Sequence, residues 1–316
     1  MRMGGPYLDP KYDFAFKQLF GQPRNADLLM DFLNAALHRD LHTRITAVEF
    51  RNTEQIAQHK KDKTTRLDIF VETQAKERIN IEIQVAEEQE MPERSLLYWS
   101  DLYRTQAMAG TEYTQLNRAI TINLLDFELD FRDSTDSYHS TYHLTEDANG
   151  RRLTNVLEMH FMELPKWRQT VVSVEEVVRH PLEKWLAFLD IGDNEQIRTA
   201  LEGAAMTDPT LEKALEELEE LGRDPENWAA YISLKKTIFD AAAKEARQKR
   251  LLKEAREQGL EQGLEQGLEQ GLEQGEHHRA VTMARKMLLA GEPVHKVVEF
   301  TDLTLEEVQR LKEELQ

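Results

Sequence analysis

The 316-residue sequence contains no cysteine. This absence excludes disulfides, Cys-ligated zinc and a thiol nucleophile. Long apolar runs are also missing: no stretch approaches the roughly 18 apolar residues that a membrane-spanning helix needs. The N-terminus lacks the charged-then-apolar pattern of a signal peptide. These absences predict a soluble cytoplasmic protein with no membrane partner, and the length allows a full core and two or three units.

Positive charge is scarce as well, and it is unevenly placed. The formal net charge is −18. Residues 1–125 hold 16 Lys and Arg against 18 Asp and Glu, whereas residues 126–316 hold 24 against 40. A nearly neutral N-terminal part is compatible with a polyanionic partner. Four basic residues there form an edge where a phosphate backbone could lie, although a solvated charge run is the alternative: Lys60, Lys61, Lys63 and Arg66.

Two neighbouring stretches alternate apolar and polar residues with period two, which predicts half-buried β-strands. They are RLDIFV at 66–71 and NIEIQV at 80–85. The polar link at 74–77 is long enough only for a hairpin, so the strands should pair antiparallel. In both strands the acidic residues then lie opposite the apolar face.

If residues whose numbers sum to about 150 pair, Asp68 lies beside Glu82, with Cβ atoms roughly 5 Å apart. Two carboxylates held that close repel each other unless a positive charge sits between them. A divalent cation is the natural candidate, because hard oxygen ligands suit Mg²⁺ or Mn²⁺. The alternative is a hairpin whose polar face meets water. The isoleucine-rich second strand favours a central position and therefore the cation site.

The remaining N-terminal elements predict a mixed sheet flanked by helices, an α/β or α+β domain over residues 1–170. The apolar positions expected for its second long helix are Leu96, Leu97, Leu102 and Met108. In chain order the predicted elements are a helix over 11–38 broken at 21–23, a strand at 48–50, the hairpin, a helix from Pro92 to about Gly110, and strands at 119–125, 138–144 and 157–164.

Beyond residue 170 the spacing of leucines and valines becomes helical. We expect a helical region over 171–256, a repeat segment over 257–275 and a small helical tail over 276–316. In the tail, Thr304 and Glu307 have the spacing of a capping box. The tail is similar to a helix-turn-helix, but it holds few basic residues for a module that reads DNA, so packing is the favoured role.

The repeat segment consists of the tetrapeptide Glu-Gln-Gly-Leu, which begins at Glu257 and breaks off at Gly275. Leucines four residues apart are helix neighbours, but their stripe rotates about 40° per repeat because a turn holds 3.6 residues. Each glycine costs about 1 kcal/mol relative to alanine. We therefore expect a marginal helix that acts as a spacer or makes the chain a homo-oligomer through residues 244–316. A linker without fixed structure is the alternative.

An Asp…Glu-x-Gln arrangement on a hairpin, with a helix before and after it, resembles the core of PD-(D/E)XK nucleases. Further stretches from about Leu8 onward look like the Rpn family of recombination-promoting nucleases/putative transposases, and the repeats and the tail fit as well. These stretches are DFAFK at 13–17, LFG at 19–21, RLDI at 66–69, IEIQ at 81–84 and ELPKW at 163–167, with Arg94, Tyr98, Tyr103, Gly110 and Tyr113 at typical spacings.

The resemblance implies that Asp68 and Glu82 are metal ligands and that the carbonyl of Ile83 is the third. Gln84 stands where the wider superfamily has lysine. An amide can orient a water molecule through its carbonyl but supplies no positive charge. Lys17 could compensate from the preceding helix, and its alternative role is that of a surface lysine lying along apolar neighbours.

A further acid in the site is left open among Asp13, Glu49 and Glu54. His139 and His143 would share a strand face, but no third ligand is spaced for zinc, so they are interpreted as ordinary sheet histidines. No phosphate-cradling glycine loop and no nucleophile elbow occurs.

The resemblance thus predicts a Mg²⁺-dependent DNA endonuclease of Rpn type, with Mn²⁺ as a possible substitute. Such an enzyme would hydrolyse phosphodiester bonds with the help of the cation, and the family links this activity to recombination and mobile elements. The competing hypothesis is a catalytically silent nucleic-acid-binding or assembly protein that retains the nuclease fold.

Overall fold

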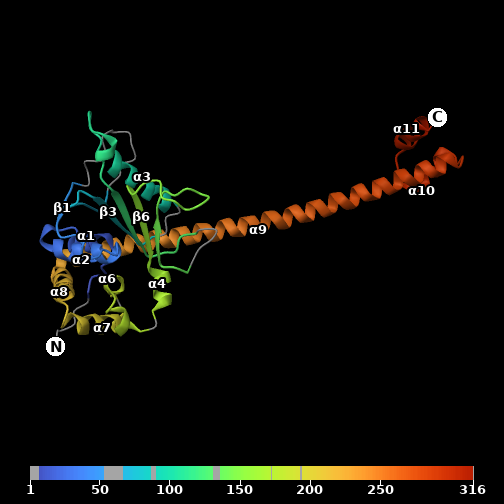
Figure 1. Cartoon of the computed structure of the whole chain (residues 1–316). Coiled ribbons are helices and arrows are strands. Elements are labelled where there is room, and N and C mark those ends of the chain that lie inside the picture. Colours follow the sequence, from blue (N-terminus) through green and yellow to red (C-terminus); the bar gives the residue numbers. More distant parts are fainter. Residues whose placement is uncertain are drawn as a thin grey trace. The chain divides into compact units, whose positions relative to one another are not determined.

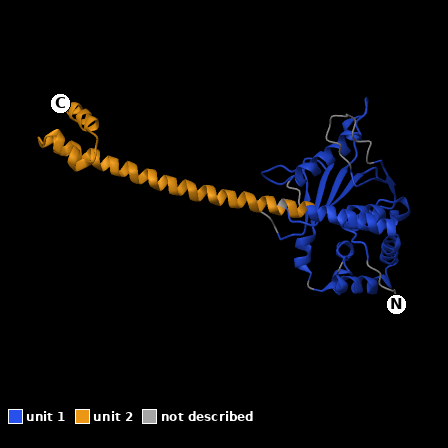
Figure 2. Ribbon diagram, turned by 180° about the vertical axis from the view of Figure 1, so that it is seen from behind, with its two compact units in different colours: residues 1–240 blue, residues 241–316 orange. Residues whose placement is uncertain are grey.

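A computed structural model describes residues 7–52, 67–86, 90–130, 136–171, 173–192 and 194–315, without the side chain at position 245. The chain divides into two compact units, Met1–Asp240 and Ala241–Gln316 (Figure 2). The predicted basic edge at residues 60–66 and Glu54 lie outside the described residues. The boundaries expected at 170, 256 and 275 remain predictions.

The first unit is built on a six-stranded mixed sheet with the order β1-β2-β3-β4-β6-β5 (Figure 1). The parallel pairs are β3 with β4 and β4 with β6, and the other neighbours are antiparallel. This architecture confirms the predicted mixed sheet flanked by helices. The strands are β1 (Val48–Phe50), β2 (Ile69–Thr73), β3 (Arg78–Gln84), β4 (Ala119–Leu125), β5 (His139–Tyr142) and β6 (Leu157–Glu163).

The predicted hairpin and its register are confirmed. Ile69 pairs with Ile81 and Val71 with Ile79, so paired residue numbers sum to 150. The isoleucines of β3 lie buried in the main core, as alternation requires, and β4 is buried along its whole length. The strand that carries Glu82 is therefore central in the sheet and not an edge strand.

One face of the sheet packs on α1 (Asp13–Phe20) and α2 (Ala26–Ala36), which α6 (Pro181–Leu189) and α8 (Pro209–Arg223) cover in turn. Aromatic rings fill the space between these helices. The rings of Phe20 and Trp185, which belong to α1 and α6, meet edge to face with centroids 5.4 Å apart. The N-terminal helices and the helices after residue 180 thus share one core.

The other face of the sheet is covered by α3 (Met91–Arg104) (Figure 1). The prediction that Leu96, Leu97 and Met108 belong to the apolar face of this helix is wrong. Leu96 and Leu97 are 51% and 45% exposed, and Met108 follows the end of the helix. The helix turns a more polar face to the sheet, because the strand surface beneath it is itself polar. That buried face consists of Met91, Ser95, Tyr98 and Leu102.

Shorter helices complete the first unit: α4 (Leu164–Thr170), α5 (Val174–Val177) and α7 (Glu195–Ala205), with 3-10 turns at Pro23–Asn25 and Tyr113–Gln115. The long helix α9 (Pro225–Leu289) begins in this unit. There the ring of Tyr231 is buried and meets Tyr12 edge to face at 5.4 Å. The start of α9 is therefore anchored to the segment that leads into α1.

In the second unit α9 runs through the whole Glu-Gln-Gly-Leu segment as a helix. Its end packs with α10 (Val294–Thr301) and α11 (Leu305–Glu314) around a small core that includes Ala284, Val297 and Val308. The predicted capping box is present: Thr304 and Glu307 exchange hydrogen bonds at the start of α11. Among the described residues, no helix is long and apolar enough to span a membrane.

Candidate metal and phosphate site

Glu82 is the most deeply buried carboxylate of the hairpin, with 1% of its surface exposed. It lies on β3 and points to the side of the sheet that α3 covers. Arg94 of α3 donates a hydrogen bond to Oε2 over 3.2 Å. Oε1 is buried and accepts no hydrogen bond from any described residue. A buried oxygen without a hydrogen-bond partner destabilises the fold. A second positive group beside this carboxylate would remove that cost.

Asp68 lies at a bend immediately before β2, at the end of the strand pair. Its Oδ2 accepts a hydrogen bond from the backbone N–H of Ile83 over 3.2 Å. Its Oδ1 forms an ion pair of 2.7 Å with Nζ of Lys17, which comes from α1 and also pairs with Asp13 at 2.6 Å. The bond to β3 fixes Asp68 against the strand segment that carries Glu82.

Burial and a neighbouring carboxylate raise the proton affinity of both Asp68 and Glu82. Burial and the charge of Asp68 raise the pKa of Glu82 to about 8, and the nearby Arg94 and the amide of Asn80 only partly oppose this rise. Burial and the charge of Asp13 raise the pKa of Asp68 despite its ion pair with Lys17. Burial alone would lower the pKa of Lys17, but the two aspartates outweigh it and raise the value. When Asp13, Asp68 and Glu82 are all ionised, the site therefore holds more negative charge than Lys17 and Arg94 neutralise.

This donor set fits a hard divalent cation. Carboxylate oxygens are the ligands that Mg²⁺ and Mn²⁺ prefer, and a cation would satisfy the unpaired oxygen of Glu82. No group of three or more His, Asp or Glu side chains converges as a metal site anywhere in the described ranges. The ligands available to a cation are therefore the carboxylates of Asp68 and Glu82 and one main-chain oxygen. The predicted third ligand is the carbonyl of Ile83, which lies between Glu82 and Gln84.

The structure brings together three of the predicted side chains, Asp68, Glu82 and Lys17. Gln84 is placed two residues beyond Glu82 on the same strand and is half-buried. Its main-chain carbonyl accepts a hydrogen bond from Asp126, which holds the end of β3 against the end of β4. Alternation along β3 puts the Gln84 side chain on the same side of the sheet as Glu82.

Comparison with family models gives one match, to the PD-(D/E)XK nuclease family transposases, over residues 10–247. The chain belongs to this family. The match covers the sheet, its helices and the start of the long helix, so it confirms the recognition made from the motifs. No curated protein and no solved structure matches the chain. Membership of the PD-(D/E)XK nuclease family transposases supports a nuclease-like function associated with mobile elements.

Arg94 and Tyr98 complete the site of this family member, and sequence reasoning gave them no role beyond a typical spacing. Arg94 bridges the two partners, since its Nε donates to the hydroxyl of Tyr98 over 2.8 Å while its Nη2 reaches Glu82. Burial and the charge of Glu82 raise the pKa of Tyr98. Arg94 and Tyr98 are four residues apart on a predicted helix, and residues at that spacing share a helix face. This spacing is the one feature of the sequence that pairs them.

Of the two open acids that the structure describes, Asp13 and Glu49, Asp13 is the one that reaches the site. The side chain of Glu49 is 61% exposed and pairs with Arg51 over 2.9 Å. Glu49 belongs to the edge strand β1. Asp13 stands beside Lys17 and is close enough to raise the pKa of Asp68. It therefore acts through Lys17, whose ammonium group lies between the two aspartates.

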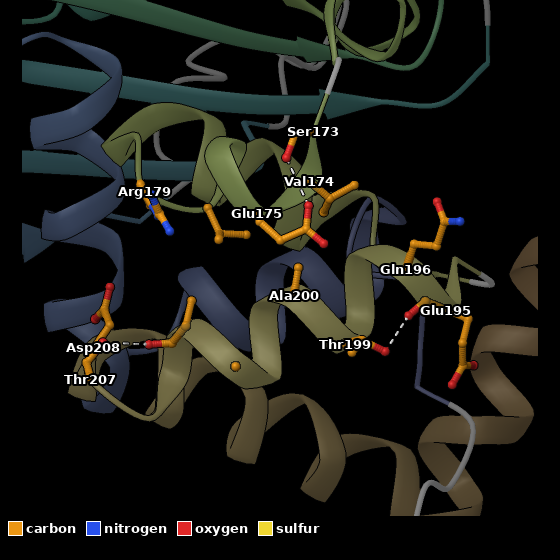
Figure 3. A pocket seen from close by; sticks show the side chains of 13 residues that line it. Ser173, Val174, Glu175, Arg179, Glu195, Gln196, Thr199, Ala200, Thr207 and Asp208 are labelled. Atoms are coloured by element: carbon orange, nitrogen blue, oxygen red, sulfur yellow. Dashed lines mark hydrogen bonds between the residues drawn. The ribbon is translucent and has the colours of Figure 1, made fainter.

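A cavity of about 560 Å³ opens beside Asp68. It is lined by Asp13, Phe14, Lys17 and Gln18 of α1 and by Ala230 and Leu234 of α9. The largest of the described cavities, about 1090 Å³, lies elsewhere, between α5 and α7 (Figure 3). Its wall carries Glu175, Glu195 and Asp208 against a single arginine, Arg179, which is a poor lining for a polyanion. The smaller cavity, and not the larger one, adjoins the carboxylate site at Asp68.

A second acidic cluster lies at the carboxyl end of β4. Its aspartates, Asp126 and Asp190, both pair with Arg168 at 2.6 and 2.5 Å, and each is also 3.5 Å from Lys11. These carboxylates are neutralised by side chains of the protein. They differ in this respect from Glu82, whose Oε1 has no described partner.

Of the histidines singled out in the sequence, His139 belongs to a hydrogen-bonded chain on the opposite edge of the sheet, and His143 lies beside this chain. The rings of His139 and His160 are joined over 2.9 Å, and His160 is bonded to Glu158 over 2.9 Å. His143 lies 3.8 Å from Glu158, which also pairs with Arg118. The chain ties β5 to β6, and it shares no residue with the Asp68–Glu82 site.

Proposed function

We propose that this family member is a DNA endonuclease that depends on Mg²⁺, with Mn²⁺ as a substitute, and that Asp68 and Glu82 hold the cation. One observation carries the proposal: the buried Oε1 of Glu82 has no partner among the described residues and lies next to a second carboxylate with a raised pKa. In a protein core such an oxygen is destabilising unless a hydrogen-bond donor or a cation completes its surroundings, and a cation also offsets the charge of the second carboxylate.

A divalent cation bound there would lower the pKa of a water molecule and stabilise the charge that develops on a phosphodiester. The protein's own residues position the substrate. Lys17 lies at the wall of the open cavity and offers its ammonium group to a phosphate oxygen. Arg94 holds Glu82 in place and has a second bond to Tyr98, which keeps its guanidinium oriented. Gln84 would orient the attacking water through its amide carbonyl.

The second candidate is a catalytically silent protein that binds nucleic acid or assembles on it while retaining the nuclease fold. Gln84 is the observation that favours it, since a neutral amide stands where a lysine is usual in the superfamily. The two candidates differ in the fate of the DNA: one cuts it in a cation-dependent way, and the other binds it without cutting.

A plasmid-nicking assay with Mg²⁺, Mn²⁺ or EDTA separates the candidates. The proposal expects nicking with either cation, none with EDTA, and loss of at least about a hundredfold in Asp68→Ala and Glu82→Ala, because each change removes a cation ligand. Glu112→Gln is the matched control, since this exposed carboxylate lies outside the site. Equal nicking by all variants at equal melting temperature would remove the reaction from this site.

We also propose that the second unit makes the chain a homo-oligomer. Four leucines of the repeats, Leu260, Leu264, Leu268 and Leu272, are 59–76% exposed along a helix that glycines weaken. A helix of this composition needs a partner to cover its leucines. Light scattering on the full chain and on a chain ending at Arg250 tests the proposal: the full chain should be larger than a monomer, and the shortened chain should be monomeric.

A further inference from the structure

The part of α9 in the second unit is divided into a basic and an acidic half. Residues 244–256 carry six Lys or Arg and two Glu, whereas residues 257–276 carry six Glu and no Lys or Arg. Both halves are exposed along the helix wherever side chains are described. The change of sign falls between Arg256 and Glu257, so the helix presents opposite charges on the two sides of one point.

The acidic half has little intrahelical compensation, since among the described residues only Glu257 at its start has a pair within the helix, a long one of 3.9 Å with Lys253. Its repeat glutamates, Glu261, Glu265, Glu269 and Glu273, follow one another at spacings of four, and like charges at that spacing repel on a helix. None of these four has an ion-pair partner among the described residues. On the basic half Arg250 and Lys253 have only long, exposed pairs of 3.6 and 3.9 Å within the helix. Each half therefore retains charge for a partner.

Apolar side chains accompany both halves. Leu251 and Leu252 of the basic half are 51% and 73% exposed, as are the four repeat leucines of the acidic half at 59–76%. The repeat glycines have no other atom within 4 Å of an added Cβ. A second helix could therefore approach this surface closely.

We propose that the exposed segment of α9, residues 243–274, pairs with the same segment of a second copy in antiparallel orientation. The inference deepens the oligomer proposal above and is independent of the nuclease chemistry. Antiparallel pairing lays the basic half of each copy on the acidic half of the other, whereas parallel pairing in register sets like charges side by side. Charge complementarity therefore favours the same segment of a second copy as the partner and favours antiparallel over parallel orientation.

The charge pattern also sets the register. The centres of the two halves match when paired residue numbers sum to about 517, which puts Lys244 opposite Glu273 and Arg256 opposite Glu261. The same register brings Leu252 close to Leu264. The two-fold axis of such a pair passes near Gln258, because in an isologous contact a residue at the axis meets its own copy. This places Ala243 opposite Gln274 of the second copy.

Because the chain lacks cysteine, single spin labels can be placed on the full chain at Gln258→Cys, Ala243→Cys and Gln274→Cys. All three positions are exposed. Pulsed electron resonance then measures the distance between two copies. Antiparallel pairing predicts a short distance at 258, below about 25 Å for helices in contact. It predicts about 45 Å at both 243 and 274, from a rise of 1.5 Å per residue.

A parallel pair would instead give short distances at all three positions, and this result would overturn the proposal. Absence of a dipolar signal at micromolar concentration would also overturn it. If duplex DNA binding were then lost in the variant with Arg247→Glu, Arg250→Glu and Lys253→Glu, nucleic acid would be assigned as the partner of the basic half. Because no cleavage is measured, failure of the nuclease proposal leaves each of these outcomes unchanged.

A charge exchange provides a second readout. Changing Glu261, Glu265, Glu269 and Glu273 to Lys makes both halves basic and should abolish pairing. Changing Lys244, Arg247, Arg250, Lys253 and Arg256 to Glu as well should restore it, because the complementarity is then re-formed with the signs reversed. Pairing that survives the first set of changes would contradict an electrostatic choice of direction.

Discussion

The two units treat their large side chains in opposite ways. In the first unit Trp185 is fully buried, and its indole N–H donates to Asp31 over 3.0 Å. In the second unit Leu264 is 76% exposed although it lies in the middle of a helix. The first unit thus derives its fold from contacts within the chain. The long exposed segment of the second unit depends on whatever covers it.

Charges show the same contrast. Lys184 in the first unit is nearly buried and pairs with Asp31 and Asp208 at 3.1 and 2.6 Å. In the Glu-Gln-Gly-Leu segment Glu261, Glu265, Glu269 and Glu273 have no ion-pair partner among the described residues. In the described part of the first unit, the pair of Asp68 and Glu82 departs from this pattern, because when both are ionised they leave excess negative charge inside a well-packed domain. Such an exception within a satisfied core is the mark of a functional site.

The largest effect that tests this comparison is on stability. Trp185→Ala should lower the free energy of unfolding of the first unit by about 3–5 kcal/mol, because it leaves a large cavity and removes the hydrogen bond of the indole to Asp31. Leu264→Ala should change this free energy of unfolding by no more than about 0.5 kcal/mol. Urea unfolding followed by tryptophan fluorescence measures both. Similar losses in the two variants would erase the distinction between the units.

The second prediction concerns Lys17. Lys17→Met should reduce nicking about 10–100-fold, equivalent to about 1.4–2.7 kcal/mol, because the positive group at the cavity wall is removed. Lys17→Arg should recover part of this loss. Lys213→Met is the matched control, since Lys213 forms an exposed pair with Asp27 away from the site. If both methionine variants lost activity equally, the effect would come from net charge rather than from the position of Lys17.

The third prediction concerns pH. Burial and the neighbouring rings of His160 and His38 lower the pKa of His139 to about 4 from 6.5. Between these values the unfolded chain binds a proton that the folded chain does not. The contribution of His139 to stability is therefore complete above about pH 6.5 and falls as pH decreases toward 4, by about 3 kcal/mol. His139→Gln should flatten this part of the curve, whereas exposed His42→Gln should leave it unchanged.

Burial alone would raise the pKa of Glu158, but the hydrogen bond with His160 and the charge of Arg118 lower it to about 2. Its contribution is present above pH 4.5 and is lost progressively as pH falls from 4.5 toward 2, so it overlaps the range assigned to His139 only between about pH 4 and 4.5. Chemical unfolding at a series of pH values distinguishes the two. An equally steep fall between pH 6.5 and 4.5 in His139→Gln would contradict the assignment.

The smallest effect is expected from Gln84→Lys. If Gln84 only orients water, a cation at this position should keep nicking or raise it, by no more than about tenfold, or about 1.4 kcal/mol. Melting temperature serves as the control for folding. Complete loss of nicking with cation binding retained would show that the amide has a specific role.

Much of the sheet could be predicted from the sequence. Strict alternation identified β2 and β3, and the short link between them determined the register that brings Asp68 toward Glu82. The uniformly apolar run at 119–125 predicted a buried strand. Local pattern suffices in these cases because a one-residue slip would turn every side chain of the strand to the other face.

The phase of α3 could not be predicted in the same way. Apolar periodicity pointed to Leu96 and Leu97, but Ser95 and Tyr98 take the buried positions. Ser95 is bonded to Thr121 over 2.9 Å, and Asn123 donates to it over 2.9 Å. A polar helix face that meets a polar strand face gives no hydrophobic signal. The turn of Arg94 into the site, which follows from this phase, was therefore missed.

The unpaired oxygen of Glu82 also lies beyond a sequence-based prediction. Its state depends on the positions of Arg94 and Asn80, which come from a helix and from the strand itself. In the repeats, glycine content argued for a marginal helix, and the structure has a continuous one. Helix propensity predicts the free-energy cost of forming that helix. The sequence of the segment alone does not identify the partner that would offset this cost.

The central claim is that Asp68 and Glu82 together bind a divalent cation, and Mn²⁺ titration followed by electron paramagnetic resonance tests it without relying on cleavage. We expect one Mn²⁺ per chain, displaced by excess Mg²⁺. This binding should be retained in Glu112→Gln and lost in both Asp68→Asn and Glu82→Gln, which keep the shapes of the side chains. Unchanged Mn²⁺ binding in the last two variants would contradict the account.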